Sequence, residues 1–486
     1  MSLAKIELMK PHFIILVLVM ITQSLKSQDC NCQKDFEFVV SYYEENLPGF
    51  IDNVTDNKIE DYNKFKNRLS NLSKNYCNNE ELCFKTLLVY VEFFKDNHSS
   101  IYINKSVSVD ENNKEQVNQF LLSDIFRNRE IIKNINIITD NSIQDIENQY
   151  QTKDTAYTVA VIENKNEFRD YVGIIIDSRT PLWKKGQVKF ELKRIKENTY
   201  DMFMYMRNHS LRYYKNVQLV NGVLNDSWYN TSLNKKISYN IDMAHRDLTF
   251  RELDKETNYL YIPTFDRNWY AKISEFYEKY DTIIQGKPYL IIDVRNNGGG
   301  SDACASPLLK YIYTRPFKSD KVDVYATKEN IRRFSEWYEG MKKDTTNFSK
   351  EFLKKFKEEI ATMKSVPNKT FIPRSIGETV SMDSVLRNPK KIVIITNKYC
   401  ASSCETLLFW AIESDKTIIV GENSGGYVGY GEISAVKTPN FSFELGCTMT
   451  RYTNQREYET DGIPPKYYLS NDKDWIEQAL NILKNN

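Results

Sequence analysis

The segment KIVIITNKYCASSCETLLFW, residues 391–410, decides the fold class of this chain. Six mostly apolar, β-branched residues precede a short polar turn, and a second apolar run follows the turn. This order predicts a buried strand that leads into a helix. Ser402 and Ser403 lie at the junction. A serine here is typical of a helix N-cap, and it is also placed for nucleophilic chemistry because the free amides of a helix N-terminus stabilise negative charge.

The same alternation of strand and helix extends through the C-terminal half. The apolar run YLIIDV, residues 289–294, precedes the turn RNNGGGS, and TIIVGE supplies a further strand. Continuous apolar strands that alternate with helices predict a largely parallel sheet covered on both faces. The glycines at 298–300 let backbone amides approach a reacting oxygen, whereas the Lys-Ser/Thr of a phosphate-binding loop is missing after them.

The length of 486 residues exceeds one ordinary core, so several domains are expected. Helical spacing predicts an N-terminal helical domain with a connector over residues 28–150. Alternating apolar runs predict a small β-rich module, a barrel or sandwich, over residues 151–250. It occupies the position of a PDZ domain but lacks a clear PDZ carboxylate loop. An α/β domain follows over 251–486, with a charged helical insertion at about 315–380 that is either a lid or a solvated excursion.

The N-terminus predicts export. A basic residue, the apolar run FIILVLVMIT and small polar residues are typical of a cleavable signal peptide over residues 1–27. Eight cysteines fit an oxidising compartment, so a secreted or periplasmic protein with disulfides is expected. Cys77 and Cys83 are candidates for closing a small loop. The cysteines lack the paired spacing of a zinc site, and no metal is expected.

Charge excludes some partners. Lys and Arg number 66 against 65 Asp and Glu, a net charge of +1, which gives no reason to expect nucleic acid or an anionic membrane as a partner. No membrane association is expected beyond the signal peptide.

Three motifs in order carry a family resemblance: DVRNNGGGS at 293–301, TNKYCASSCETLLFWA at 396–411 and GENSGGYVGYG at 421–431. Over roughly residues 255–470 they resemble the catalytic domain of the tail-specific (C-terminal processing) serine protease family. The resemblance implies a ClpP/crotonase-like parallel-sheet domain that needs no cofactor. It places the nucleophile on Ser402 and the oxyanion-hole amides on Ser403 and on Gly299 or Gly300.

The general base departs from the pattern of many family members, which use a lysine after the Gly-Glu turn. Tyr427 or a neighbour stands there, and a tyrosine with a pKa of about 10 is a poor base near neutrality. A second branch of the family uses a histidine in an Asp-x-His-Ser/Thr segment, which KDNHSSI matches at His98. That branch places a carboxylate before a late glycine turn, where Glu459 matches and Asp461 remains the alternative.

The sequence therefore predicts an exported serine endopeptidase or C-terminal processing peptidase that acts on protein or peptide substrates through Ser402, His98 and Glu459. The alternative is a peptide- or polymer-binding protein on the same scaffold that has lost catalysis. Asn423-Ser424-Gly425-Gly426 is similar to the nucleophile segment of trypsin-like proteases, but Ser424 is expected to lie in a structural or substrate-side turn.

Overall fold

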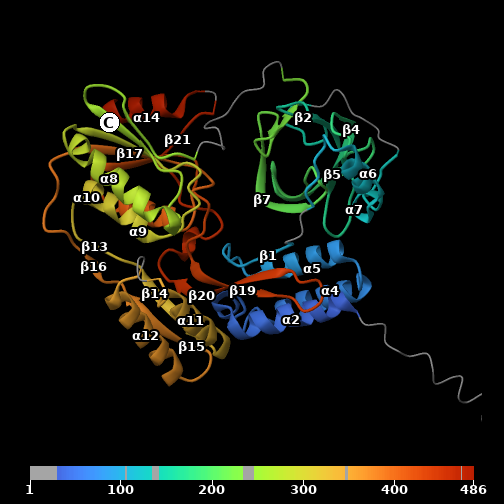
Figure 1. Cartoon of the computed structure of the whole chain (residues 1–486), viewed down its shortest axis with the longest axis horizontal. Helices are drawn as coiled ribbons and strands as arrows, with labels where there is room; N and C mark the ends of the chain where they lie inside the picture. The colour runs from blue at the N-terminus through green and yellow to red at the C-terminus, as the bar shows by residue number, and fades with distance from the viewer. Residues whose placement is uncertain are drawn as a thin grey trace, which may run out of the picture.

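Three regions surround a common centre in the computed structural model, which describes residues 30–103, 107–133, 142–233, 246–344, 348–471 and 473–485. In Figure 1 an α/β region lies at upper left, a β-barrel at upper right, and N-terminal helices with a second sheet below them both. The expected signal peptide, residues 1–27, lies outside the described residues.

The α/β region is built on a six-stranded sheet. Its strands follow the order β10 (Thr249–Glu252), β11 (Thr257–Tyr261), β12 (Tyr289–Asp293), β17 (Lys391–Thr396), β18 (Thr417–Gly421) and β21 (Tyr467–Tyr468). All neighbouring pairs are parallel except β10 with β11. The parallel strands all present their carboxyl ends at one edge, so the loops after β12, β17 and β18 gather there.

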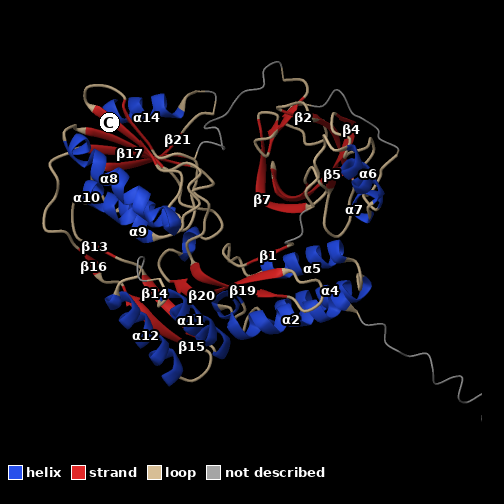
Figure 2. Ribbon diagram, viewed as in Figure 1, coloured by secondary structure: helices blue, strands red, loops and turns tan. Residues whose placement is uncertain are grey.

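Helices cover both faces of this sheet (Figure 2). Leu290 and Ile292 of β12 pack into one core with the helices α8 (Tyr270–Gln285), α9 (Asp302–Ala305), α10 (Leu309–Ile312) and α13 (Ser403–Ile412). Ile291 points to the other face, where α14 (Trp475–Asn485) packs. Both faces of the strands are thus apolar, which explains their unbroken apolar sequence. The short 3-10 helices are η1 (Arg267–Trp269), η2 (Ser306–Leu308) and η3 (Arg456–Tyr458).

A second sheet joins the two ends of the chain. Its strands run in the order β1 (Ser100–Tyr102), β20 (Glu444–Tyr452), β14 (Lys321–Ala326) and β15 (Thr370–Ile376), and β19 (Tyr430–Lys437) also pairs with β20. The antiparallel register aligns Ser100 with Gly446. This pairing fixes the chain just after His98 against the C-terminal third of the protein.

The insertion at 315–380 is part of this second sheet. It contributes β14 and β15, and its helices α11 (Lys328–Met341) and α12 (Lys350–Ser365) share a core with Met449 of β20. The short strands β13 (Phe317–Lys318) and β16 (Thr379–Val380) pair at its base. The insertion is thus neither a free excursion nor a separate lid, because its apolar stripe is buried against the sheet.

The N-terminal helices are α2 (Asn31–Asn46), α3 (Pro48–Asn53), α4 (Ile59–Asn75) and α5 (Glu80–Glu92). Two disulfides tie the start of α2 to the turn after α4 and to the first turn of α5: Cys30–Cys77 and Cys32–Cys83, respectively. The expected loop between Cys77 and Cys83 is therefore wrong, since each has a partner at the start of α2. A third disulfide joins Cys400 to Cys404, and Cys304 and Cys447 are free and buried.

The β-rich module is a closed barrel, within the alternatives expected from its sequence. Its strands are β2 (Gln149–Thr152), β3 (Tyr157–Glu163), β4 (Tyr171–Ser178), β5 (Val188–Lys196), β6 (Thr199–Tyr205), β7 (Leu211–Val220), β8 (Val223–Leu224) and β9 (Trp228–Asn230). Trp228 and Phe190 fill its centre, and the helices α6 (Lys114–Leu122) and α7 (Asp124–Arg127) cover one side.

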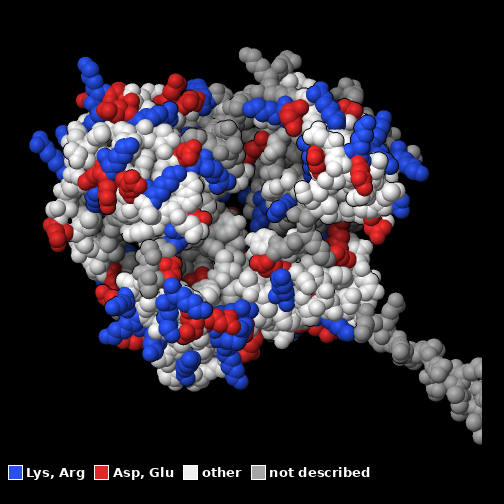
Figure 3. All heavy atoms as spheres, in the orientation of Figure 1, with Lys and Arg blue, Asp and Glu red and all other residues white. Residues whose placement is uncertain are grey.

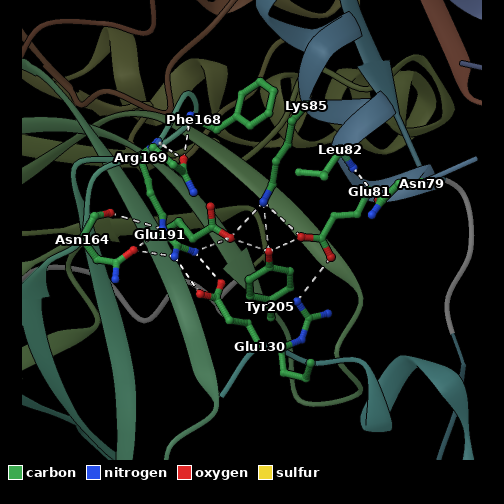
Figure 4. A network of polar contacts seen from close by, with 12 residues as sticks. Asn79, Glu81, Leu82, Lys85, Glu130, Asn164, Phe168, Arg169, Glu191 and Tyr205 are labelled. Carbon is green, nitrogen blue, oxygen red and sulfur yellow. Dashed lines mark hydrogen bonds and ion pairs between the residues drawn. The ribbon is translucent and has the colours of Figure 1, made fainter. Parts of the chain in front are cut away.

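A buried polar network joins the barrel to α5 (Figure 4). Lys85 Nζ donates to Glu81 Oε1 at 3.0 Å, to Glu191 Oε1 at 2.9 Å and to the hydroxyl of Tyr205 at 3.1 Å. Arg169 forms a two-pronged pair with Glu130 at 2.7 and 2.8 Å. A buried ion must be paired to be tolerated, so separating the barrel from α5 would leave these charges unsatisfied.

Positive and negative side chains are interspersed over the face seen in Figure 3. Among the described residues, no helix is long and apolar enough to cross a bilayer.

Candidate active site

A pocket of about 480 Å³ lies at the carboxyl edge of the parallel sheet. Its walls come from the loops after β12 and β17, from the loop between β18 and β19, from β19 itself and from the segment between α5 and β1. The lining residues are His98, Gly298, Gly300, Lys398, Tyr399, Ala401, Ser402, Tyr427 and Ile433. Two of the three residues expected to form a catalytic triad, His98 and Ser402, therefore border one cavity, although the sequence separates them by some three hundred positions.

Ser402 stands at the entrance to α13. Its backbone adopts φ 55° and ψ −123°, a conformation that non-glycine residues rarely adopt. Such strain persists only where the surroundings enforce it, and it is frequent at functional sites. Ser402 lines the pocket, whereas the neighbouring Ser403 is buried with 8% exposure. The Cys400–Cys404 disulfide closes a loop around both serines.

Glu405 holds this loop against the turn after β18. The side chain is fully buried. Its Oε2 accepts the backbone N–H of Ser402 at 2.9 Å and that of Tyr427 at 2.8 Å. Its Oε1 accepts the hydroxyl of Ser424 at 2.5 Å and the N–H of Gly426 at 2.8 Å. Burial raises the pKa of Glu405, and the hydrogen bonds from these four donors partly offset the increase.

The bond to Glu405 assigns Ser424 a structural role, which is one of the two roles expected for it from the sequence. Its hydroxyl donates to Glu405 and accepts the backbone N–H of Ile463 at 2.7 Å. Ser424 is 4% exposed and is not among the residues that line the pocket.

The glycine turn packs directly on the serine loop. A Cβ on Gly299 would lie 2.4 Å from the carbonyl oxygen of Ala401 and 2.9 Å from the Cβ of Ser402, and the residue has φ +86°. Only glycine permits this approach. The N–H of Gly299 donates to Asn297 Oδ1 at 3.0 Å, while Gly300 lines the pocket. Of the two glycines named from the sequence, Gly300 is thus the better placed to serve a bound oxyanion.

His98 follows α5 in a turn built on Asp96. The Oδ1 of Asp96 accepts the N–H of His98 at 3.0 Å and that of Ser99 at 3.1 Å. Its Oδ2 accepts the hydroxyl of Thr448 on β20 at 2.6 Å. Asp96 therefore caps the turn and also ties it to the C-terminal third of the chain.

The imidazole of His98 is held in a mostly apolar setting. Its ring meets the edge of the Tyr427 ring at a centroid distance of 5.3 Å. Its Nδ1 is buried without a hydrogen-bond partner among the described residues. Burial lowers the pKa of His98 below 6.5, partly offset by Asp96 and the carbonyl of Tyr430. The neutral ring, the form that accepts a proton, is therefore favoured.

Glu459 lies behind this turn. Its Oε1 accepts the N–H of Asn97 at 2.7 Å, and its Oε2 accepts those of Val428 at 2.8 Å and Gly429 at 2.6 Å. The carboxylate thus connects the residue before His98 to the loop that carries Tyr427. Burial, aided by Asp96, raises the pKa of Glu459 to about 7. Asp461, the alternative from the sequence, has an exposed side chain.

Tyr427, which the sequence analysis expects at or next to the position of the family's lysine, forms part of the pocket wall. Burial raises its pKa, so the phenol stays protonated near neutrality and offers no base. The sequence analysis missed the role of Glu405, although the spacing of Glu405 three residues after Ser402 is the signal of a helix capping box.

Comparisons with known proteins agree with the family resemblance of the three sequence motifs. The sequence profile of Peptidase family S41 matches residues 256–469. This region defines a serine peptidase domain. Residues 256–469 belong to the tail-specific protease family, peptidase family S41. The comparison with curated proteins gives no match.

Matches to solved structures cover nearly the whole chain. The structure of mature CPAF shares 12% identity, covers 94% of this chain and 97% of its own, and has a TM-score of 0.48. The structure of the photosystem II D1 C-terminal processing protease shares 11% identity, covers 94% of this chain and 97% of its own, and has a TM-score of 0.35. The structure of a lipoprotein from Streptococcus agalactiae shares 12% identity, covers 93% of this chain and 96% of its own, and has a TM-score of 0.37.

Proposed function

We propose that the protein is an exported serine endopeptidase or C-terminal processing peptidase that hydrolyses peptide bonds through Ser402, His98 and Glu459. The observation that carries the proposal is the pocket that Ser402 and His98 line together. The strained backbone of Ser402 at a helix entrance and the lowered pKa of His98 both support it. The disulfides are compatible with a secreted or periplasmic location.

In this mechanism Ser402 Oγ attacks the scissile carbonyl while His98 takes its proton and later delivers it to the leaving amine. The amides of Ser403 and Gly300 hold the oxyanion. Glu459 acts through the backbone: its bond to Asn97 N–H fixes the turn that carries the ring, and its negative charge stabilises the imidazolium that forms. The ClpP/crotonase-like arrangement of the domain stays a prediction.

The test compares the two adjacent serines in purified protein with an unstructured protein substrate at neutral pH. Ser402→Ala should lower kcat/KM by on the order of 10⁴-fold or more, because the nucleophile is gone. Ser403→Ala keeps the backbone amide and removes only a buried hydroxyl, so it should retain cleavage.

Equal cleavage by the native protein and Ser402→Ala would overturn the assignment of the nucleophile. The second candidate is a peptide-binding protein without catalysis, which is favoured by the absent lysine and by the Nδ1 of His98 that has no partner among the described residues. Binding of the substrate without cleavage by the native protein would support this candidate.

A further inference from the structure

One charged residue of the pocket has no part in the proposed mechanism. Lys398 is the only Lys, Arg, Asp or Glu among the nine residues that line the cavity. It lies four positions before Ser402 on the same loop. Because burial lowers the pKa of His98, the imidazole is mainly neutral near pH 7. The pocket therefore presents a single fixed positive charge next to the reacting hydroxyl.

A carboxylate from the barrel now faces this ammonium. Lys398 Nζ lies 2.5 Å from Asp226 Oδ2, and the hydroxyl of Tyr399 donates to the same oxygen at 3.4 Å. Asp226 belongs to the turn between β8 and β9. The position beside Lys398 is thus shaped for an oxygen anion, with two donors that converge on it.

The ion pair lies at the edge of solvent. The side chains of Lys398 and Asp226 are 35% and 59% exposed. Such pairs contribute little net free energy, because water and salt compete with them. A second acid, Glu422, also acts on Lys398, but burial raises its pKa and it accepts a hydrogen bond from Asn471 at 3.4 Å. An incoming carboxylate therefore needs to displace only Asp226.

We propose that Lys398 determines specificity by binding a carboxylate of the substrate close to the scissile bond, and that Asp226 takes the place of this carboxylate in the free protein. The inference rests on the peptidase function proposed above. The ligand is a peptide with an aspartate or glutamate side chain, or one whose free C-terminal carboxylate reaches the pocket. In both cases the charge-assisted bond to Lys398 is the same.

Displacement of Asp226 also releases one contact between the barrel and the loop of Ser402. The barrel contacts the other wall of the pocket through Lys215, whose Nζ lies 2.5 Å from Glu92 Oε2 and donates to Asn97 Oδ1 at 3.1 Å. These two contacts, Asp226 with Lys398 and Lys215 with Asn97, join the barrel to two different segments, the loop after β17 and the turn after α5. A substrate carboxylate at Lys398 frees one of them and leaves the other in place.

The experiment measures binding and cleavage separately. Fluorescently labelled, unstructured peptides are made in pairs that differ only by Glu against Gln at successive positions, and by a free against an amidated C-terminus. Kd is measured by anisotropy with Ser402→Ala protein, and kcat/KM with protein that retains Ser402. Both sets include Lys398→Met, Lys398→Arg, Asp226→Asn and the control Lys279→Met, whose side chain is exposed on α8.

We expect the carboxylate member of at least one pair to bind about tenfold more tightly, the gain of one charge-assisted bond. Lys398→Met should abolish this preference and Lys398→Arg should keep most of it. Asp226→Asn should strengthen carboxylate binding, and Lys279→Met should change nothing. The Glu/Gln and acid/amide pairs show which source of the carboxylate is used.

Equal binding of both members of every pair, or a preference that survives Lys398→Met, would overturn the inference. Cleavage without any carboxylate preference rejects this specificity and leaves the peptidase function intact. A preference in binding without cleavage of any peptide supports Lys398 and rejects the peptidase function.

Discussion

The backbone N–H of Asn97 donates to Glu459 Oε1 at 2.7 Å, across 362 positions of sequence. This bond attaches the turn that carries His98 to the C-terminal loop. The imidazole is positioned by the sheet pairing of β1 with β20 and by this carboxylate, in addition to the local turn built on Asp96.

The pH dependence of activity should report Glu459. Hydrolysis requires an ionised Glu459 and a neutral His98, and the higher of the two pKa values sets the acidic limb. The pKa of Glu459 is about 7 and that of His98 is lowered, so kcat/KM should rise with pH with a midpoint near 7. Glu459→Gln should lower kcat/KM by about 10²-fold and move the limb below 6.5.

The control for this profile is Asp461→Asn, whose exposed carboxylate should matter little. A limb that moves with Asp461→Asn and not with Glu459→Gln would assign the carboxylate role to Asp461.

Glu405→Gln should destabilise the fold. Each carboxylate oxygen accepts two hydrogen bonds, and the four donors belong to Ser402, Ser424, Gly426 and Tyr427. In the glutamine variant an NH₂ group replaces one of these oxygens, and it cannot accept the two hydrogen bonds that the oxygen accepted. The expected loss is about 2–3 kcal/mol of unfolding free energy. Urea denaturation followed by tryptophan fluorescence measures it. Glu413→Gln at the exposed end of the same helix should stay near the native value.

The Cys400–Cys404 disulfide should matter for both activity and stability. Replacing both cysteines with alanine removes a short cross-link, which costs about 2 kcal/mol, and frees the loop that holds Ser402. Because small misplacements of a nucleophile are costly, kcat should fall by at least about tenfold. Reducing agent should inhibit the native protein and leave the residual activity of the double variant unchanged. Similar inhibition of both would place the sensitive bond elsewhere.

Two neighbouring glycines should respond differently to alanine. At Gly299 the new Cβ meets the carbonyl of Ala401 at a positive φ, so the cost is about 2–4 kcal/mol. At Gly298 a Cβ finds no atom within 4 Å. Thermal unfolding should separate the two variants by several degrees. Equal melting temperatures would mean that the glycine turn accommodates a Cβ at Gly299 without a loss of stability.

Short motifs and local periodicity predicted much of this structure. The strand, turn and helix around Ser402 follow from residues adjacent in sequence, and the parallel sheet follows from its doubly apolar strands. His98 was found through a local pattern as well, and the structure brings it to the pocket of Ser402.

The long-range pairings were not predictable in the same way. The insertion reads as a lid or a solvated excursion because charged residues recur through its helices, yet β14 and β15 complete a sheet with a distant strand. The cysteines at 77 and 83 are close in sequence but bond to the start of α2. Nothing local encodes such partners, since they depend on where α2 packs. The same holds for Asp226, which reaches Lys398 only because the barrel docks beside the loop.

The pairing of β1 with β20 also has a consequence for the newly made chain. His98 leaves the ribosome early, while the strand that anchors it, the loop of Tyr427 and the carboxylate of Glu459 are all translated near the end. The growing polypeptide therefore lacks part of the pocket wall until almost its last residues are synthesised. The proposed catalytic site therefore cannot be complete before synthesis of the chain is nearly finished.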